Sequence, residues 1–333
     1  MKFVIVGAGA TGGYLGALLA RTGEDVTLIA RGPHLAAMRD HGVRVREAGE
    51  EWSVRPECTD DGTVLQTAEV CLLTLKAHSL AGVAPRLREL LGPDTAVLPA
   101  QNGIPWWYFQ QYGGPLEGTQ LTTLDPDGVL AECLEVRRLL GCVVWPATRL
   151  VEPGVVEHIE GNRFTIGELN GERTARATAI AECLNRAGLK CRVSRRIRNE
   201  IWTKLLGNAV MNPLSALTRA TLVRIATLPE TRALARDMMA EAALVAEALG
   251  APIDVSVERR LEMAEAVGEH RSSMLQDVES GRPLEVEALL GVIVELGELL
   301  GIATPCLRTV YACVKLLDQT LRGTAKVGAR GGI

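Results

Sequence analysis

A glycine-rich turn near the N-terminus constrains the fold of this chain more than any other stretch. Lys2–Val6 is a β-branched run without alternation, which is typical of a buried parallel strand. The turn Gly7-Ala8-Gly9-Ala10-Thr11-Gly12 follows at once, and Asp25–Ala30 predicts a second strand after a helical stretch closed by Gly23. A turn in this strand, helix and strand context is typical of dinucleotide binding. The sequence therefore predicts an N-terminal Rossmann-type domain with a parallel sheet.

Each glycine of this turn answers a different physical need. Gly7 allows the tight turn, Gly9 lets the backbone approach a pyrophosphate, and Gly12 lets the helix pack closely on the strand. The first N–H groups of the helix then point at the phosphates. A plain strand-to-helix turn can also use glycine, but the surrounding pattern favours cofactor binding. We therefore predict that the cofactor contacts every residue of the turn, namely Gly7, Ala8, Gly9, Ala10, Thr11 and Gly12.

The end of the second strand selects between NAD and NADP. An NAD site places an Asp or Glu there, which accepts a hydrogen bond from the ribose 2′-hydroxyl. This chain has Ala30 followed by Arg31. A guanidinium can pair with a 2′-phosphate through a charge-assisted fork. The sequence favours NADP, although Arg31 can also be interpreted as a solvated loop residue.

Two later strands end in polar side chains. Glu69–Leu75 runs into Lys76, and Ala96–Leu98 runs into Gln101, Asn102 and a glycine. Ligands gather at the carboxyl ends of strands in open parallel sheets, so Lys76 is a candidate for facing the cofactor. Asn102 can also be a simple turn residue, because Asn-Gly is strong turn chemistry. His78, two residues beyond Lys76, is expected to begin the next helix rather than to act as a base.

The rest of the first half alternates short β patterns with one helix. A surface hairpin is predicted from Val43–Arg46 and Trp52–Arg55. His158 alternates with apolar neighbours and is expected to face water. The remaining predicted elements are strands at Gly141–Val144, Val155–Ile159, Phe164–Glu168 and Leu189–Val193 and a helix over Glu172–Ala187.

A polar stripe marks the first helix of the second half. Reading Ile197–Asn212 as a helix places Lys204, Asn208 and Asn212 four residues apart on one face. Pro213 disfavours helical geometry at Asn212, so the helix is expected to end there. A lysine backed by two amides is suited to protonate and hold a small oxygen-rich substrate. A solvated helix face is the plainer interpretation.

Strand signals disappear in the second half, which predicts an all-helical domain. Glycine just past each helix and proline soon after it are the expected stop signals. The chain is therefore predicted to be an α/β protein with a cofactor domain over 1–195, a helical domain over 196–333 and a substrate cleft between them. Helices beyond the first are predicted at 230–249, 255–279, 284–300 and 305–321.

Composition excludes several functional classes. The net charge is −4 with both signs interspersed, so no basic face for nucleic acid is expected. Eight scattered cysteines without a Cys-x-x-Cys pair argue against a zinc or redox site and predict buried, reduced thiols in a cytoplasmic protein. Neither a signal peptide nor a membrane-spanning run is predicted, and no metal-ligand cluster stands out.

These motifs together resemble one family, the ketopantoate reductases (2-dehydropantoate 2-reductases), over nearly the whole chain. The combination of C-terminal motifs makes the resemblance specific. The matching residues are Gly7-Ala-Gly9-Ala-Thr-Gly12, Thr74-Leu-Lys76-Ala, Asn102-Gly103, Ile201-Trp-Thr-Lys204-Leu, Asn208, Asn212-Pro-Leu, Ser272-Ser273-Met-Leu-Gln-Asp277 and Glu285.

The resemblance implies NADPH-dependent reduction of a 2-keto acid, with ketopantoate reduced to pantoate in pantothenate and coenzyme A synthesis. It implies Lys204 as the proton donor and Glu285 as an acid that orders the site beside substrate and cofactor. The substrate is then held by Asn102, Asn208, Asn212 and Ser273. Besides the glycine turn, the residues along NADP are Arg31, Lys76, Asn102, Ala147 and Glu285.

Departures from the family pattern leave the substrate open. The stretch between Asn102-Gly103 and Gly141-Cys142 is long, and it contains the aromatic run 104–109 and Asp125-Pro-Asp127. The aromatic run is a substrate-side wall, a subunit contact or a plain packing cluster. Gln101 stands where some members have histidine. A different 2-keto acid or carbonyl substrate is therefore one alternative, and a non-catalytic NADP-binding sensor is another. Helical domains of this kind often pair as homodimers.

Overall fold

Five parallel strands form the central sheet of the first part of the chain. The computed structural model describes residues 1–328. Two compact units divide it, one made of Met1–Gln101 and Pro105–Ile197, the other of Asn102–Ile104 and Arg198–Ile333. The strand order in the central sheet is β5-β2-β1-β6-β7. The strands are β1 (Lys2–Val6), β2 (Asp25–Ile29), β5 (Glu57–Thr59), β6 (Val70–Leu73) and β7 (Ala96–Pro99).

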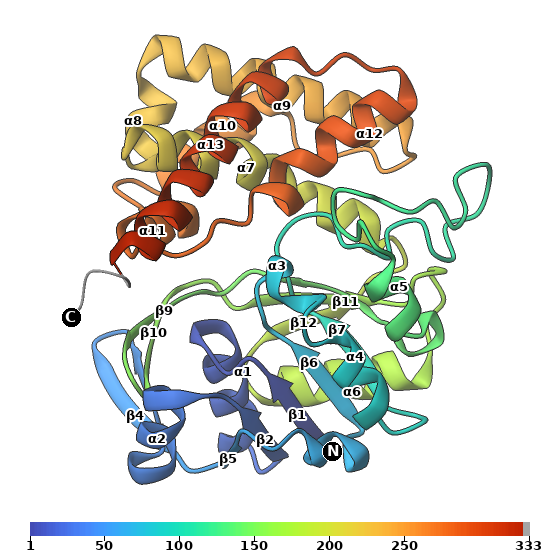
Figure 1. Ribbon diagram of the computed structural model, residues 1–333, viewed down its shortest axis with the longest axis vertical. Helices are drawn as coiled ribbons and strands as arrows, with labels where there is room; N and C mark the ends of the chain where they lie inside the picture. Colours follow the sequence, from blue (N-terminus) through green and yellow to red (C-terminus); the bar gives the residue numbers. More distant parts are fainter. Residues whose placement is uncertain (329–333) are drawn as a thin grey trace. The chain divides into compact units, whose positions relative to one another are not determined.

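The predicted Rossmann-type arrangement is confirmed in this sheet. All four strand pairings are parallel, and the register places Val6 opposite both Ile29 and Leu73. Figure 1 shows α1 lying against β1. A Cβ on Gly16 of α1 would lie 2.4 Å from Cδ2 of Leu28, so the helix packs closely on the sheet. The helices of this unit are α1 (Ala10–Arg21), α2 (Gly32–His41), α3 (Ala77–Leu80), α4 (Ala84–Leu90), α5 (Val129–Cys133) and α6 (Ala175–Arg186), with 3₁₀ turns η1 (Gly62–Thr67) and η2 (Val136–Arg138).

Two smaller sheets complete the first unit. The predicted hairpin is confirmed, because β3 (Val43–Glu47) pairs antiparallel with β4 (Glu50–Val54). It belongs to a four-stranded sheet in the order β4-β3-β10-β9. The sequence did not predict β9 (Ala147–Glu152), whose exposed residues lack the alternation of a half-buried strand. The fourth strand of this sheet is β10 (Val155–Glu160). A separate three-stranded sheet has the order β12 (Lys190–Val193), β11 (Arg163–Gly167) and β8 (Gly141–Val144).

His158 does not face water, so that prediction was wrong. Its side chain is 12% exposed, and its ring stacks on Tyr14 of α1 at a centroid distance of 4.6 Å. Nδ1 lies 2.8 Å from Oε1 of Glu47, and Nε2 lies 2.6 Å from the carbonyl oxygen of Gly161. The alternating pattern placed His158 on the correct strand, but α1 covers that face of the sheet.

Within the first unit, ion pairs tie the N-terminus and Arg186 to the buried carboxylate of Glu24. The Glu24 side chain is 7% exposed, 2.7 Å from the Met1 ammonium and 2.6 Å from Nη2 of Arg186. Burial acts to raise the pKa of Glu24, but the hydrogen bonds from Met1 and Arg186 lower it to about 2. The bond to Glu24 also raises the pKa of the Met1 ammonium above its ordinary 8.0. Full stabilisation is therefore present between about pH 4.5 and 8.

Glu24→Gln is expected to lower the free energy of unfolding by about 2 kcal/mol at pH 7, because two charge-assisted hydrogen bonds lose their anion. The ionised carboxylate stabilises the fold above its ordinary pKa of 4.5, so the difference from the unchanged protein should shrink as the pH falls toward 2. Urea unfolding at a series of pH values measures this. Glu182→Gln, an exposed change on α6, is the control. A pH-independent difference would contradict the assignment.

The second unit is helical throughout the residues that the structure describes. The predicted helix over 255–279 is in fact two helices, separated near Gly268, which has a φ of +77°. A π-helical turn, η3, precedes α12, and α8 was not predicted. The elements are α7 (Ile197–Thr218), α8 (Leu222–Thr227), α9 (Pro229–Ala248), α10 (Val257–Ala266), α11 (Ser273–Glu279), η3 (Glu287–Gly291), α12 (Val292–Leu300) and α13 (Pro305–Gly328).

The helix that carries the polar stripe continues past its proline, which corrects the expected end at Asn212. α7 runs to Thr218 with Pro213 inside it. Pro213 has no N–H to bond the preceding turn, and this normally weakens a helix. Here Met211, Leu214 and Ala216 are all buried, so both sides of the proline are held by apolar packing. Tertiary packing therefore outweighs the local preference.

Six of the eight cysteines are buried, as predicted, and all eight are free. Burial raises the pKa of the Cys71 thiol to about 12. Cys306 is half-buried and Cys313 is exposed, so these two depart from the prediction. Among the described residues, no helix combines the length with the apolarity that crossing a membrane requires.

Candidate active site

The glycine turn is held rigidly at the carboxyl end of β1. The N–H groups of Gly7 and Ala8 both donate to the carbonyl oxygen of Ile29, at 3.1 and 3.0 Å. Thr74 Oγ1 donates to the carbonyl oxygen of Gly7 at 2.8 Å. Gly7 has a φ of +96°, and a Cβ on Gly12 would lie 2.4 Å from Thr74 Oγ1. These two glycines are therefore required by the fold itself.

Gly9 is different, because none of the residues that the structure describes excludes a side chain there. A Cβ on Gly9 would meet no atom of the described residues closer than the Gly7 carbonyl oxygen at 4.0 Å. α1 begins at the next residue and has no side-chain cap at its N-terminus. Open space and uncapped N–H groups at the same place fit the close approach of a pyrophosphate. The residues present thus fit a dinucleotide cofactor.

Ala147 lies near this turn, because the residue that follows it contacts the first turn of α1. Thr11 Oγ1, in the first turn of α1, is 3.3 Å from Thr148 Oγ1 on β9. The start of β9 therefore adjoins the N-terminus of α1. The structure brings Thr11 and Ala147 into one region although 136 positions separate them in the chain.

Arg31 lies just after the second strand of the central sheet. It is the N-cap residue of α2, directly after the buried Ala30 at the end of β2. Its side chain is exposed, and no ion pair to it is found among the described residues. The strand end thus presents a guanidinium where NAD enzymes place a carboxylate.

His34 supports the glycine turn, a role that no pattern in the sequence predicts. Its Nε2 lies 2.6 Å from the carbonyl oxygen of Ala8, and its Nδ1 accepts a hydrogen bond from the N–H of Gly154 at 2.9 Å. Accepting at Nδ1 requires the proton to sit on Nε2, which therefore donates to Ala8. One imidazole thus ties the turn to α2 and to the β9–β10 connection.

His34→Ala is expected to weaken cofactor binding roughly tenfold, because a lost hydrogen bond frees the Ala8 carbonyl and loosens the turn. His34→Gln keeps a donor near the Nε2 position and should recover part of the affinity. Titration of NADPH fluorescence measures both. His41→Ala, an exposed change at the other end of α2, should bind as the unchanged protein does. If the His34→Ala variant bound NADPH as tightly as the unchanged protein, the supporting role of His34 would be rejected.

Lys76 follows β6 as the N-cap residue of α3, and His78 lies inside that helix as predicted. Gln101 fixes the backbone just before Lys76. Its Nε2 donates to the carbonyl oxygens of Leu73 and Leu75 at 2.7 and 3.0 Å. The residue that departs from the family pattern therefore has a structural role at this strand end.

In the second unit, Lys204 meets Asn102. Lys204 Nζ donates to Oδ1 of Asn102 at 2.7 Å. The backbone around Asn102 is fixed by the N–H of Ile104, which donates to the carbonyl oxygen of Ala288 at 3.0 Å. Gly103 between them has a φ of +92° and lies so close to Ala288 that a Cβ would clash. Asn102 is thus more than a turn residue, because its amide orients the ammonium of Lys204.

The far end of the polar stripe meets the start of α11. Asn212 Nδ2 donates to Oγ of Ser273 at 3.4 Å. Ser272, next to it, caps α11 by accepting from the N–H of Leu275 at 3.1 Å. Asn208 lies half-buried between Lys204 and Asn212 on α7. The structure therefore brings together the stripe, Asn102 and Ser273 within one unit.

Glu285 stands outside the helix in which the sequence placed it. It lies in the irregular segment just before Val286, where helical structure begins. The N–H of Leu284 donates to Oδ1 of Asp318 at 2.8 Å, which anchors this segment on α13. Glu285 is half-buried there.

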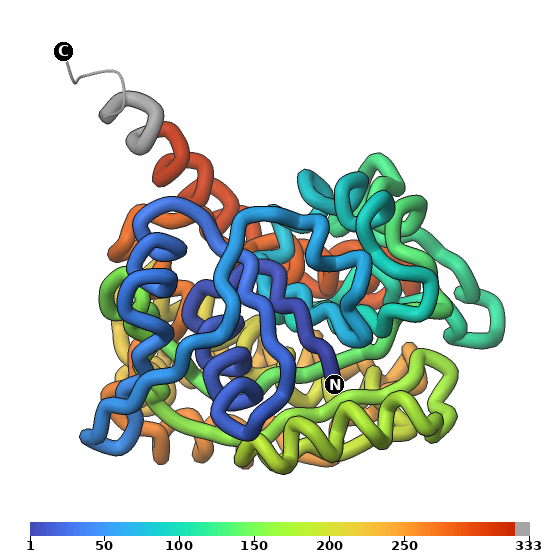
Figure 2. The backbone as a smooth tube through the Cα atoms, turned by 90° about the horizontal axis from the view of Figure 1, so that it is seen from below, coloured from blue at the N-terminus to red at the C-terminus, as the bar shows by residue number. Residues whose placement is uncertain are grey.

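The aromatic run 104–109, at the start of the long segment after Gly103, is a packing cluster, one of the three interpretations that the sequence left open for it. Trp107, Tyr108 and Phe109 are fully buried, and Tyr108 and Phe109 meet edge to face at 5.1 Å. Asp125 is buried and accepts from the N–H groups of Leu130 and Ala131, so it holds the start of α5. The backbone of this segment, teal to green in Figure 2, contains no helix or strand before α5.

Known proteins resemble the chain along nearly its full length. A family model described as ketopantoate reductase PanE/ApbA matches residues 3–171, and one for the C-terminal part of that family matches residues 196–318. A 2-dehydropantoate 2-reductase of Mesorhizobium japonicum is 46% identical over 318 residues, covering 95% of this chain and 98% of that protein.

Solved structures give the same result. A PanE/ApbA family ketopantoate reductase from Ralstonia eutropha has a TM-score of 0.83 at 30% identity, covering 97% of this chain and 100% of that one. A dimeric ketopantoate reductase from Staphylococcus aureus has a TM-score of 0.74 at 23% identity, covering 96% of this chain and 100% of that one. The second likeness concerns the fold alone.

Proposed function

We propose, because the chain belongs to the ketopantoate reductase family, that it reduces 2-dehydropantoate to pantoate with NADPH in pantothenate and coenzyme A synthesis. Membership of the family makes the chain an oxidoreductase that acts on CH–OH groups with a nicotinamide dinucleotide. The choice of NADPH and of 2-dehydropantoate, and the roles of individual residues, are our proposal.

The contact between Lys204 and Asn102 carries the proposal. An ammonium held in a fixed direction at 2.7 Å from an amide oxygen is suited to stabilise negative charge on a carbonyl oxygen and then to protonate it. Asn102 positions Lys204 and also contacts substrate and cofactor. A solvated helix face would leave the lysine ammonium in water, and the observed partner favours the catalytic role instead.

The remaining polar groups of the second unit hold the substrate. Asn208 and Asn212 present amides on the same face of α7 as Lys204. Ser273 adds a hydroxyl within reach of Asn212. Glu285 orders the site from the segment before η3, beside substrate and cofactor. The amides and the hydroxyl donate to the oxygen atoms of a keto acid, and the carboxylate of Glu285 accepts hydrogen bonds from donor groups.

The cofactor, when bound, supplies the hydride that reaches the keto carbon. The protein holds it through the six residues of the glycine turn, with Arg31 on the 2′-phosphate. The contact between Thr11 and Thr148 supports the role of Ala147 as a neighbour of the cofactor. The other residues that we place along the cofactor are Lys76, Asn102 and Glu285.

A panel of 2-keto acids, with 2-dehydropantoate included, tests the function by the loss of NADPH absorbance. We expect 2-dehydropantoate to give the highest kcat/KM. A higher kcat/KM for another 2-keto acid would support the reductase activity but identify a different substrate. NADPH binding without turnover on any carbonyl compound would instead favour the sensor.

We also propose a cytoplasmic homodimer. Free cysteines fit a reducing compartment. Exposed leucines on α9 and α13, Leu244 and Leu316, offer apolar surface for a second copy. Light scattering of the purified protein tests the assembly, and a monomer at micromolar concentration would reject the dimer.

A further inference from the structure

Both ring nitrogens of His158 on β10 face oxygen acceptors. Nε2 lies 2.6 Å from the carbonyl oxygen of Gly161, which can only accept a hydrogen bond. Nδ1 lies 2.8 Å from Oε1 of Glu47 on β3. A neutral imidazole donates from one nitrogen only, so the second contact needs a further proton between Nδ1 and the carboxylate. The pair of His158 and Glu47 therefore holds a titratable proton inside the first unit.

Tyr14 of α1 stabilises the charged form of this pair. Its ring lies parallel to the imidazole, with an interplanar angle of 6° and a centroid distance of 4.6 Å. The face of a tyrosine ring attracts a cation placed over it. The Tyr14 hydroxyl also donates to Oε1 of Glu47 at 3.1 Å, which favours the ionised carboxylate. Burial raises the pKa of Tyr14, so this phenol keeps its proton and continues to donate.

The other charged groups on the elements around His158 are arginines and glutamates. They are Arg21 of α1, Arg44 and Arg46 of β3, Glu50 and Glu51 of β4, Arg149 and Glu152 of β9, and Glu157 and Glu160 of β10. Arginine and glutamate ordinarily keep their charge between about pH 6 and 9, whereas histidine does not. His34 of α2 accepts at Nδ1 from the N–H of Gly154 and therefore acts as a neutral ring, so its protonation affects only the acid side. The proton lost as the pH rises above neutral is the one that His158 shares with Glu47.

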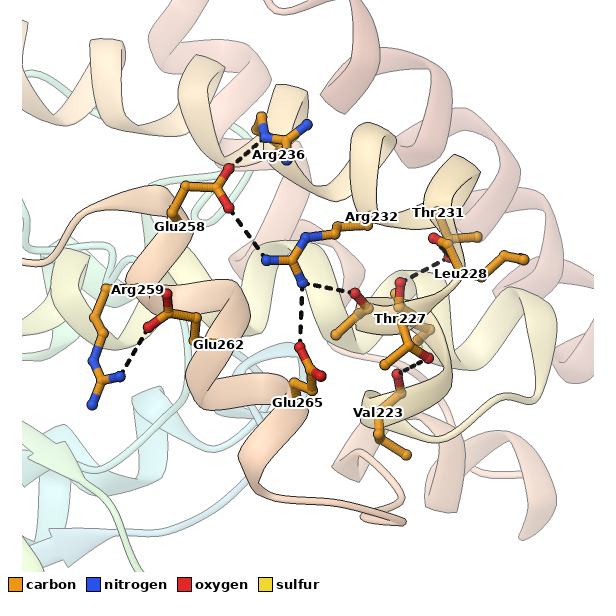
Figure 3. Close-up of polar contacts among 12 residues, drawn as sticks. Val223, Thr227, Leu228, Thr231, Arg232, Arg236, Glu258, Arg259, Glu262 and Glu265 are labelled. Atoms are coloured by element: carbon orange, nitrogen blue, oxygen red, sulfur yellow. Dashed lines mark hydrogen bonds and ion pairs between the residues drawn. The ribbon is translucent and has the colours of Figure 1, made fainter.

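Ion pairs made only of arginine and glutamate do not respond to pH in this way. In the second unit, Glu258 of α10 accepts from Arg236 at 2.5 Å and from Arg232 at 3.2 Å, as Figure 3 shows. The hydrogen bond from Arg236 lowers the pKa of Glu258, so this carboxylate stays ionised at and above neutral pH. The network therefore keeps its charges on the alkaline side and supplies a control for the test below.

The start of α1 packs on the two strands that carry this pair. Thr11 Oγ1 is 3.3 Å from Thr148 Oγ1, and Thr148 lies opposite His158 in the pairing of β9 with β10. A Cβ on Gly13 would lie 3.1 Å from Cγ2 of Val156. The ring stack on His158 adds a third contact. The first turn of α1, whose N–H groups are proposed to point at the pyrophosphate, thus rests on β9 and β10.

We infer that His158 is a positioning residue of the cofactor site and that its additional proton makes cofactor affinity depend on pH. With the proton in place, Glu47 and Gly161 hold the ring, and the ring holds the first turn of α1. As the pH rises, the proton passes to solvent, and a ring nitrogen then faces an oxygen lone pair with no hydrogen between them. The contact loosens, so affinity falls on the alkaline side. The inference rests on the proposed placement of the cofactor at the glycine turn.

The test measures the dissociation constants of NADPH and NADH by fluorescence between about pH 6 and 9. NADH is included because it lacks the 2′-phosphate, which itself takes up a proton at about pH 6. Both constants should rise roughly fivefold from about pH 7 to 9 in the unchanged protein. His158→Gln keeps an amide donor but cannot take up the proton. It should bind both cofactors with the weaker affinity, which should not change with pH.

A second variant and a spectroscopic measurement complete the test. Glu47→Gln removes the anion that retains the proton and should abolish the pH dependence in the same way. Glu262→Gln is the matched control, because it removes an exposed carboxylate that pairs with Arg259 in Figure 3 and should leave the pH profile unchanged. Nitrogen NMR of the unchanged protein identifies His158 by the proximity of its ring protons to Tyr14. At neutral pH its two ring nitrogens should have similar chemical shifts, because both carry hydrogen, whereas a neutral ring gives widely separated shifts.

The outcomes separate this inference from the proposed function. A pH profile of the His158→Gln variant that matches the unchanged protein, or widely separated nitrogen shifts of His158 at neutral pH, would overturn the inference while the reductase stands. Weaker binding in both variants with the pH dependence intact would show a purely structural role and would also overturn it. Binding of neither cofactor at any pH would reject the proposed function, and the coupling with it. If the His158→Gln variant does not fold, the nitrogen shifts and the Glu47→Gln profile decide.

Discussion

Lys204→Met is expected to lower kcat roughly a thousandfold, because general acid catalysis and charge stabilisation at the carbonyl oxygen are lost together. Methionine keeps most of the length of the side chain and removes only the ammonium that Asn102 orients. The dissociation constant of NADPH should stay within twofold of the unchanged value, since the glycine turn is untouched. Steady-state kinetics and a fluorescence titration measure the two quantities.

Two further variants separate charge from proton transfer. Lys204→Arg keeps a positive charge but cannot readily give up a proton, so it should remain close to the methionine variant in kcat. Lys190→Met, an exposed change on β12, should have full activity. Near-normal turnover of the methionine variant at position 204 would remove Lys204 from the mechanism.

Arg31→Asp is expected to reverse the choice of cofactor. The guanidinium that pairs with the 2′-phosphate is replaced by a carboxylate that repels it and accepts from a ribose 2′-hydroxyl. The dissociation constant of NADPH should rise roughly a hundredfold, and that of NADH should fall. Titrations of both reduced cofactors give the ratio directly.

The control for this exchange is Arg88→Asp, which reverses an exposed charge on α4. It tests whether net charge alone affects cofactor affinity. Affinities for both cofactors that do not change in the Arg31→Asp variant would show that Arg31 is a solvated loop residue. Loss of both affinities together would place Arg31 in a structural role at the start of α2.

Local patterns were enough to predict most of the fold. The apolar run Lys2–Val6 and the glycine turn define β1 and the start of α1, because both signals lie within a few residues of one another. β9 was missed because its exposed residues carry no alternation. The expected helix end at Asn212 was wrong because buried contacts on both sides of Pro213 hold α7 together. Sequence periodicity does not report such tertiary packing.

The candidate site shows the same limit. Helical spacing placed Lys204, Asn208 and Asn212 on one face, but the bond to Asn102 joins residues 102 positions apart. Only the family resemblance connected them. His34 was not predicted, because a lone histidine has no local signal. Its role depends on which backbone carbonyl its side chain meets in the fold.

Tracing the hydride tests the central claim most directly. The purified protein is incubated with 2-dehydropantoate and NADPH that carries deuterium at the transferred position of the nicotinamide, and the product is examined by mass spectrometry. The proposed function predicts pantoate with a single deuterium on the carbon that bore the keto group. Oxidised cofactor without labelled pantoate, or no reaction while another 2-keto acid acquires the label, would contradict it.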